Sequence, residues 1–201
     1  AFAATMIFYK EEAPEALAET GMQDAAADSR EQSFTTNDSR TQAAASGQLV
    51  NRLEIASPIK GTVIRQEAMK DEAFGSGALG KGVAILPKEG KVFAPADGVI
   101  SAFFPTLHAI GITTDTGAEL LIHVGLDTVQ LNGEGYTAKA AEGDRVKKGQ
   151  LLLEFDIALL QVKGFCIETP VLVTNADDYL DIMETSAESV NAGEMLLNIL
   201  N

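Results

Sequence analysis

The most informative stretch of the sequence is Ile112-Thr113-Thr114-Asp115-Thr116-Gly117-Ala118-Glu119-Leu120, which has the pattern of a strand, a tight turn and a second strand. A turn centred on Asp115-Thr116-Gly117 predicts a hairpin, because the length of the loop sets which residues pair. Facing residues then have numbers that sum to about 231. The only two histidines of the chain, His108 and His123, meet this condition. We therefore expect their imidazoles to lie opposite one another or one place off.

The residues beside the two histidines favour a chemical site. Histidine is the side chain whose ordinary pKa lies near neutrality, and both of its ring nitrogens can react. Gly125 leaves space next to His123, and Thr106 would present a hydroxyl on the same face of a regular strand as His108. Asp127 could orient a group bound there. The pattern fits a phosphohistidine site, in which one imidazole is the nucleophile and the other donates to phosphoryl oxygens.

Two other interpretations stay open on these residues alone. Histidines in strands are commonly structural residues held by hydrogen bonds, and a pair of aligned histidines can also bind zinc. A zinc site needs three or four ligands, however, and the sequence places no cysteine or third histidine near the pair. Structural, metal-binding and phosphoryl-transfer roles are therefore all compatible with the hairpin.

Outward from the hairpin, short apolar runs alternate with glycine, proline, aspartate and asparagine. This pattern is typical of many short strands, so we expect an all-β, antiparallel sandwich or barrel-like domain with short helices. The expected helical pieces lie near 71–74, at 127–129, and at 157–163 with Asp156 as a possible N-cap. The expected strands lie at 61–64, 82–86, 91–94, 98–104, 109–114, 119–124, 150–155 and 170–174.

The composition restricts the class of partner. The formal net charge is −14, which argues against nucleic acid, because phosphate contacts need clusters of lysine and arginine. The same charge is compatible with a basic protein partner. Hydrophobic residues make up 46% of the chain, enough for a substantial core. The single cysteine, Cys166, excludes an intramolecular disulfide and fits a reducing compartment.

The first fifty residues differ in composition from the rest. Residues 1–50 carry 8 acidic and 3 basic side chains and few large apolar ones. We expect residues 10–50 to be a flexible acidic linker, because such a stretch buries too little surface to offset its ordering entropy. The apolar residues 1–9 are too short for a signal peptide, and they are compatible with the end of a membrane segment, a buried helix end or an expression remnant.

A long run of motifs resembles the glucose-type enzyme IIA domain of the bacterial phosphoenolpyruvate:sugar phosphotransferase system. The signature is His123-Val124-Gly125-Leu126-Asp127-Thr128-Val129-Gln130-Leu131-Asn132-Gly133-Glu134-Gly135. The resemblance covers nearly all of residues 53–201, in order. Further matching segments lie at 57–61, 80–87, 94–100, 142–150, 154–156 and 169–171.

The resemblance implies a role for each site residue. His123 would accept the phosphoryl group from the small phosphocarrier HPr and pass it to a cysteine of an enzyme IIB domain. His108 and Thr106 match a supporting histidine and threonine, and Asp127 and Asp156 match acidic residues flanking the site. The family fold is a β-sandwich, and we expect neither a cofactor nor a metal. Lys81 departs from the family, since the enteric form has an aspartate there, at the rim of the site.

The resemblance also implies a cellular context. Members are often fused behind a B domain and a sugar-transporting membrane domain, so residues 1–9 resemble the end of that domain and 51–201 would be the enzyme IIA domain. We expect the chain to be the C-terminal part of a fused permease, at the cytoplasmic face of the bacterial membrane. It would contact the membrane only through the permease. Candidates for contact with HPr are apolar residues that could equally belong to the core: Val83, Ile85, Leu126 and Val129.

Two alternatives come from other classes of protein. Glu67-Ala68-Met69-Lys70 resembles a biotin attachment sequence, and 94–100 and 143–150 resemble biotinyl and lipoyl carrier domains. The order of these segments is wrong for a carrier, so a solvated loop lysine is the expected role of Lys70. The second alternative is a regulatory protein that docks others and is switched by phosphorylation. We expect Cys166 to be an ordinary packing residue.

Overall fold

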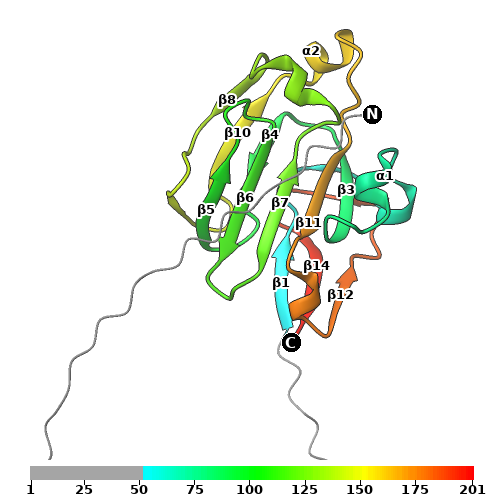
Figure 1. The fold of residues 1–201 in the computed structure, drawn as a ribbon, viewed down its shortest axis with the longest axis vertical. Coiled ribbons are helices and arrows are strands. Elements are labelled where there is room, and N and C mark those ends of the chain that lie inside the picture. The colour runs from blue at the N-terminus through cyan, green and yellow to red at the C-terminus, as the bar shows by residue number, and fades with distance from the viewer. Residues whose placement is uncertain (1–51) are drawn as a thin grey trace, which may run out of the picture. The chain divides into compact units, whose positions relative to one another are not determined.

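The computed structural model describes residues 52–201, which form short antiparallel strands joined by turns and a few short helices (Figure 1). The helical segments are η1 (Gln66–Ala68), α1 (Glu72–Gly75), η2 (Thr128–Leu131), α2 (Ile157–Val162) and η3 (Ala176–Asp178). The strands are β1 (Arg52–Ala56), β2 (Gly61–Arg65), β3 (Lys81–Pro87), β4 (Lys91–Phe93), β5 (Gly98–Phe103), β6 (Ala109–Thr114), β7 (Glu119–His123), β8 (Tyr136–Ala138), β9 (Arg145–Val146), β10 (Leu151–Phe155), β11 (Thr169–Val173), β12 (Asp181–Glu184), β13 (Ser189–Val190) and β14 (Met195–Leu200).

One large sheet carries the histidine hairpin. Its strand order is β13-β2-β3-β11-β7-β6-β5-β9, so β7 lies between β6 and β11. Two three-stranded sheets, β1-β14-β12 and β4-β10-β8, complete the fold. All the strand pairs are antiparallel. The prediction of an all-β, antiparallel domain with short helices is confirmed.

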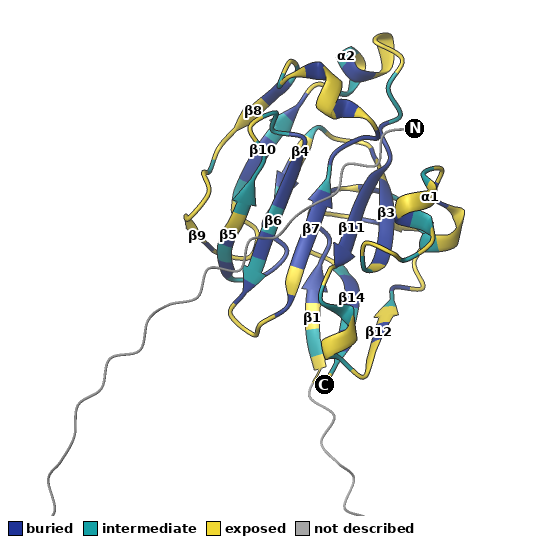
Figure 2. Ribbon diagram, viewed as in Figure 1, coloured by how far each residue is buried: buried dark blue, intermediate teal, exposed yellow. Residues whose placement is uncertain are grey.

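The large sheet is buried on both faces near the hairpin. In β7, Leu120 and Ile122 point into the main core, whereas Leu121 lies in a second, smaller apolar cluster. Successive side chains of a strand point to opposite faces, so His123 lies on the Leu121 face. Figure 2 shows the buried residues concentrated in the strands, with exposed residues in the connecting turns. The main core therefore supports the hairpin from one side and leaves the histidine on the other.

The second cluster, which we call the outer cluster, lies on the histidine face of the sheet. Its members come from β3, β6, β7 and β11 and from the segments next to them: Met69, Phe74, Ala84, Ala109, Leu121, Leu126 and Leu172, with Ile64, Phe104 and Cys166 packed against them. Burying apolar surface is worth about 25 cal/mol per Å², so the packing of this cluster stabilises the face of the sheet that carries the histidines. The packing role expected for Cys166 is observed.

The elements around the site match the sequence-based expectations closely. Every expected strand is present within about one residue, and α1, η2 and α2 occupy the three expected helical positions. The strands β1, β8, β9, β12, β13 and β14 were not predicted. Several of these have only two to four residues, too few for period-two alternation to be recognised.

The predictions for residues 1–9 and 10–50 fall outside the described residues. In the described part, none of the helices has the length and apolar content needed to span a membrane.

Candidate functional site

The hairpin brings the two histidines together, one place off register. His123 ends β7 and pairs with Ala109, the residue after His108. The backbone N–H of Val124 donates to the carbonyl oxygen of His108 at 2.7 Å. The two imidazole centroids lie 4.9 Å apart, with the rings 79° from parallel. The prediction that the rings lie opposite or one place off is confirmed.

A backbone carbonyl fixes one nitrogen of His123. Its Nδ1 lies 2.7 Å from the carbonyl oxygen of Gly125, an acceptor, so Nδ1 carries the proton and donates. In the neutral imidazole the lone pair therefore belongs to Nε2. The tautomer of His123 is thus set by the backbone carbonyl of Gly125, two residues further along the chain.

Gly125 can make this contact only because it lacks a side chain. Its φ is +79°, in the left-handed region. A Cβ at this position would lie 2.6 Å from Cγ2 of Thr128 and 3.0 Å from the carbonyl oxygen of Cys166. Thr128 is itself held, because its hydroxyl donates to the carbonyl oxygen of Val124 at 2.7 Å. The predicted space beside His123 is therefore filled by the turn that follows it.

A threonine orients His108. The hydroxyl oxygen of Thr106 lies 2.6 Å from Nδ1 of His108, so the two residues are close as expected, although both precede β6 and do not form the regular strand on which that expectation was based. Leu107 between them has a φ of +59°, which is uncommon for a residue other than glycine. Phe104 contacts the His108 ring with a centroid distance of 5.5 Å. The two ring nitrogens of His108 therefore differ, because Nδ1 is hydrogen-bonded to the Thr106 hydroxyl.

Burial keeps both imidazoles neutral. Burial is the main cause that lowers the pKa of His108 to about 4, and the neighbouring His123 lowers it further. Burial also lowers the pKa of His123, against the opposing effect of the Gly125 carbonyl and of the carboxylates of Asp71 and Asp127. At neutral pH the site therefore contains two uncharged rings and an available Nε2 lone pair on His123.

Asp71 is a site residue that the sequence analysis missed. Its carboxylate accepts from the backbone N–H groups of Ala73 and Phe74 and so caps α1. Phe74 of that helix packs against the His123 ring, with a centroid distance of 5.1 Å. The segment at 71–74 was predicted as a helix, but only the tertiary structure places it beside the histidine.

Comparison with known proteins identifies the family. The family model described as "phosphoenolpyruvate-dependent sugar phosphotransferase system, EIIA 1" matches residues 53–179. The chain belongs to the enzyme IIA family. The glucose permease IIA from Mycoplasma capricolum has the same fold, with a TM-score of 0.68 and 32% identity over 74% of this chain and 96% of that one.

Relatives of this enzyme IIA domain are both fused and separate proteins. A beta-glucoside-specific EIIBCA component of Halalkalibacterium halodurans is 54% identical over 73% of this chain and 23% of its own length. A glucose-specific EIIA component of the same organism is 45% identical over 71% of this chain and 83% of its own length. The chain thus spans about a quarter of the fused relative and most of the separate one.

The two predicted aspartates occupy different positions. Asp127 is exposed, has a φ of +60° and immediately precedes η2, close enough to act on the charge of His123. Asp156 caps α2, accepting from the backbone N–H of Leu159 at 3.0 Å. Within residues 52–201, none of the hydrogen bonds of Asp156 reaches a histidine. Its role at the site stays a prediction.

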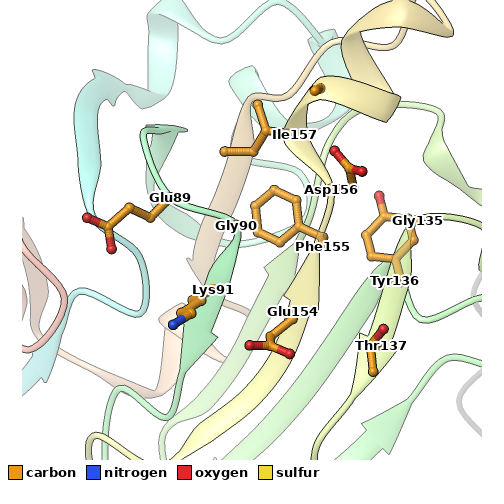
Figure 3. A pocket seen from close by; sticks show the side chains of 11 residues that line it. Glu89, Gly90, Lys91, Gly135, Tyr136, Thr137, Glu154, Phe155, Asp156 and Ile157 are labelled. Atoms are coloured by element: carbon orange, nitrogen blue, oxygen red, sulfur yellow. The ribbon is translucent and has the colours of Figure 1, made fainter.

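Asp156 also lines an open groove away from the histidines. The groove has a volume of about 820 Å³ and includes Tyr136, Glu154 and Phe155 of β8 and β10 (Figure 3). Neither histidine lines it. Two of the carboxylates around the groove are already ion-paired, Glu154 with Lys139 and Glu89 with Lys60.

Burial separates the four candidates for partner contact. Val83 and Ile85 are 0% exposed and belong to the main core, so the prediction of a partner contact is wrong for these two. Their side chains point away from the histidine face, since Ala84 between them lies in the outer cluster. Leu126 is buried in the outer cluster, whereas Val129 is 49% exposed. Val129 is therefore the candidate best placed for contact.

Two lysines noted in the sequence are also located. Lys81 is exposed at the start of β3, opposite Val173. Lys70 lies between η1 and α1, where its ammonium group pairs with Glu168 at 2.9 Å. This ion-paired position and the family membership leave the carrier-domain alternative without support. Among residues 52–201, no group of three or more histidine, cysteine, aspartate or glutamate side chains is arranged to hold a metal ion.

Proposed function

We propose that this enzyme IIA domain is a phosphoryl carrier, in which His123 accepts the group from phospho-HPr and transfers it to a cysteine of an enzyme IIB domain. The observation that carries the proposal is the contact between Nδ1 of His123 and the Gly125 carbonyl. This contact leaves Nε2 as the unprotonated, nucleophilic nitrogen. The family membership gives the same class of chemistry.

The loading step is an in-line displacement at phosphorus. The Nε2 lone pair of His123 forms a bond to phosphorus while the bond from phosphorus to the donor's imidazole nitrogen breaks, and the electron pair of that bond stays with the donor. The His123 ring becomes cationic as the bond forms. The Gly125 carbonyl and the carboxylates of Asp71 and Asp127 would favour that charge, because each of them raises the His123 pKa.

His108 stabilises the transferred group. When the Thr106 hydroxyl donates to Nδ1 of His108, the neutral ring carries its proton on Nε2. That N–H then donates to a phosphoryl oxygen beside His123, and the proton stays on His108 throughout the transfer. The low pKa of His108 keeps the ring a neutral hydrogen-bond donor. A neutral donor binds the phosphoryl group less tightly than a cation would, so the group can still be transferred onward.

The unloading step repeats the displacement on the acceptor domain. A cysteine thiolate attacks phosphorus, the bond to Nε2 of His123 breaks, and the ring returns to its neutral state. The EIIBCA relatives support an acceptor domain in the same full-length chain, at the cytoplasmic face of the membrane and coupled to sugar uptake. In that arrangement a tether raises the effective concentration of the acceptor.

Phosphoryl labelling tests the proposal. The protein is incubated with phosphoenolpyruvate, enzyme I and HPr, and acid-labile phosphate on the protein is measured. We expect His123→Ala to abolish labelling, because the nucleophile is lost. His108→Ala is expected to accept label but to pass it slowly to an enzyme IIB domain. The reason is that the phosphoryl oxygens lose the hydrogen bond from the His108 ring, which stabilises their charge during transfer.

Two results would contradict these assignments. Acid-labile label that persists in His123→Ala excludes His123 as the acceptor. Onward transfer at the wild-type rate in His108→Ala excludes the supporting role of His108. Circular dichroism of both variants is the control that the fold is intact.

A further inference from the structure

The segment between β2 and β3 forms one wall of the site. It contains η1 and α1 and supplies two groups that act on His123: the carboxylate of Asp71 and the ring of Phe74. In Figure 1 α1 lies beside β3. The segment is short of regular structure, since α1 has four residues and η1 three. Its position therefore depends on contacts made by individual side chains.

One of these contacts comes from a buried carboxylate. The Glu168 side chain is 4% exposed, yet it is ionisable, and an uncompensated charge at such a position is costly. Both of its oxygens contact Lys70: Oε1 lies 2.9 Å from the ammonium nitrogen, and Oε2 accepts from the backbone N–H at 3.2 Å. Glu168 directly precedes β11, so it is anchored to the central sheet.

A second side chain fixes the rest of the segment independently. The Gln66 amide nitrogen donates to the carbonyl oxygens of Phe74 at 3.0 Å and Gly80 at 2.7 Å. Its oxygen accepts from the backbone N–H of Gly82 at 3.2 Å. Gln66 thus joins the end of α1 to β3. The Glu168 contacts restrain the opposite end, at the residue immediately before Asp71.

We propose that Glu168, acting through Lys70, is a positioning residue that holds Asp71 and Phe74 against the phosphoryl-accepting His123. The Lys70 side chain is 68% exposed, so water screens the ion pair and the energy of the pair is modest. The backbone contact is the more specific restraint, because it fixes the main chain at the residue next to Asp71. Glu168 is not among the groups that shift the His123 pKa, so its effect is indirect.

A double-mutant cycle tests this positioning role. The His123 pKa is measured by NMR titration of its imidazole in wild type, Glu168→Ala, Asp71→Asn and the double variant. Asp71→Asn removes a carboxylate that favours the charged ring, so we expect the pKa to fall by about half a unit. Glu168→Ala is expected to cause a fall of similar size, and Asp71→Asn should add little in that background.

Additional variants separate positioning from a general loss of structure. Glu168→Gln keeps an acceptor for the Lys70 backbone N–H and is expected to restore most of the wild-type pKa. Glu154→Ala breaks the Lys139–Glu154 pair on β10 and is expected to leave the His123 pKa unchanged. If Glu168→Ala does not fold, Glu168→Met replaces it in the same cycle, because methionine fills the buried space and offers no carboxylate oxygen to Lys70.

The outcomes decide the proposal. Additive effects of the two substitutions, or a His123 pKa unaffected by Glu168→Ala, would overturn it. Its kinetic consequence, slower labelling of Glu168→Ala by phospho-HPr, rests on the proposed carrier function. The NMR titration does not depend on the carrier function. If wild type is not labelled, the carrier function is wrong; if Glu168→Ala leaves the His123 pKa unchanged, the positioning role is wrong.

Discussion

At the scale of single residues, the reactivity of the site depends on a glycine. Gly125 adopts a φ of +79° in a space where a Cβ would overlap Thr128, and its carbonyl oxygen holds Nδ1 of His123. A side chain at this position would shift the backbone that assigns the tautomer. The nucleophilic nitrogen of His123 therefore depends on the absence of a side chain at Gly125 as well as on the imidazole itself.

Substitution of this glycine tests that dependence. Gly125→Ala is expected to destabilise the fold and to reduce acceptance of phosphate, because the carbonyl must move. Gly143→Ala is the matched control: Gly143 also has a positive φ, +86°, but a Cβ there would meet nothing within 4 Å.

The difference between the two variants isolates the close contact. Each alanine in the left-handed region costs about 1–2 kcal/mol, and the overlap at Gly125 is expected to add about 1–3 kcal/mol. Urea unfolding measures both values. Equal losses of stability in the two variants would contradict the steric argument.

At the scale of elements, the β6–β7 hairpin and the α1 segment position the site. The β6–β7 ladder sets the histidine pair, with facing residue numbers summing to 232 where the turn predicted about 231. The α1 segment adds Asp71 and Phe74 to the site. The α2 helix instead uses Asp156 as its cap, and this use competes with a direct role for Asp156 in phosphoryl transfer.

Two substitutions of Asp156 separate these roles. Asp156→Asn is expected to keep the cap, because asparagine is as good an N-cap as aspartate. Asp156→Ala is expected to cost about 1 kcal/mol in unfolding free energy. If the cap is the main role, labelling by phospho-HPr stays near wild type in Asp156→Asn. A large loss of labelling in that stable variant would show that the charge itself takes part.

At the scale of the whole molecule, burying two neutral histidines links stability to pH. Both folded-state pKa values are lowered, so between about pH 4 and 6.5 the unfolded chain binds more protons than the folded one. Stability is therefore full at neutral pH and falls as the pH drops below the ordinary histidine pKa. Between pH 7 and pH 5 the carboxylates with lowered pKa values, such as Glu89 and Asp97, contribute little.

The contribution of His108 to this dependence can be measured directly. With a folded pKa of about 4, His108 should account for a loss of about 2 kcal/mol between pH 7 and pH 5. We expect wild type to lose that much more stability than His108→Gln over this range, as measured by urea unfolding at both values. Parallel losses in the two proteins would show that His108 is not buried as a neutral ring.

Much of the fold was predictable because it depends on local pattern. The β6 and β7 strands are apolar runs on either side of a turn that contains glycine. Asp71 and Asp156 directly precede short helices, as N-cap residues do. The short strands β9 and β13 were not predictable, because two residues carry no period and their state depends on a partner strand. Val83 and Ile85 show the same limit, since an apolar strand gives no sign of which face meets the core.

The sequence by itself determined the antiparallel β class and the near-opposite histidines, because loop length and strand period act over a few residues. The contact between Thr106 and His108 was expected from a regular strand, but it is made in the turn before β6, where Leu107 has a φ of +59°. Only the tertiary structure decided which aspartates reach His123. Asp71 is 52 positions from His123 in the chain, and a contact over such a distance depends on how β2, β3, β11 and β7 are ordered in the sheet. The low pKa values are decided in the same way, because burial is a property of the packed molecule and of no single segment.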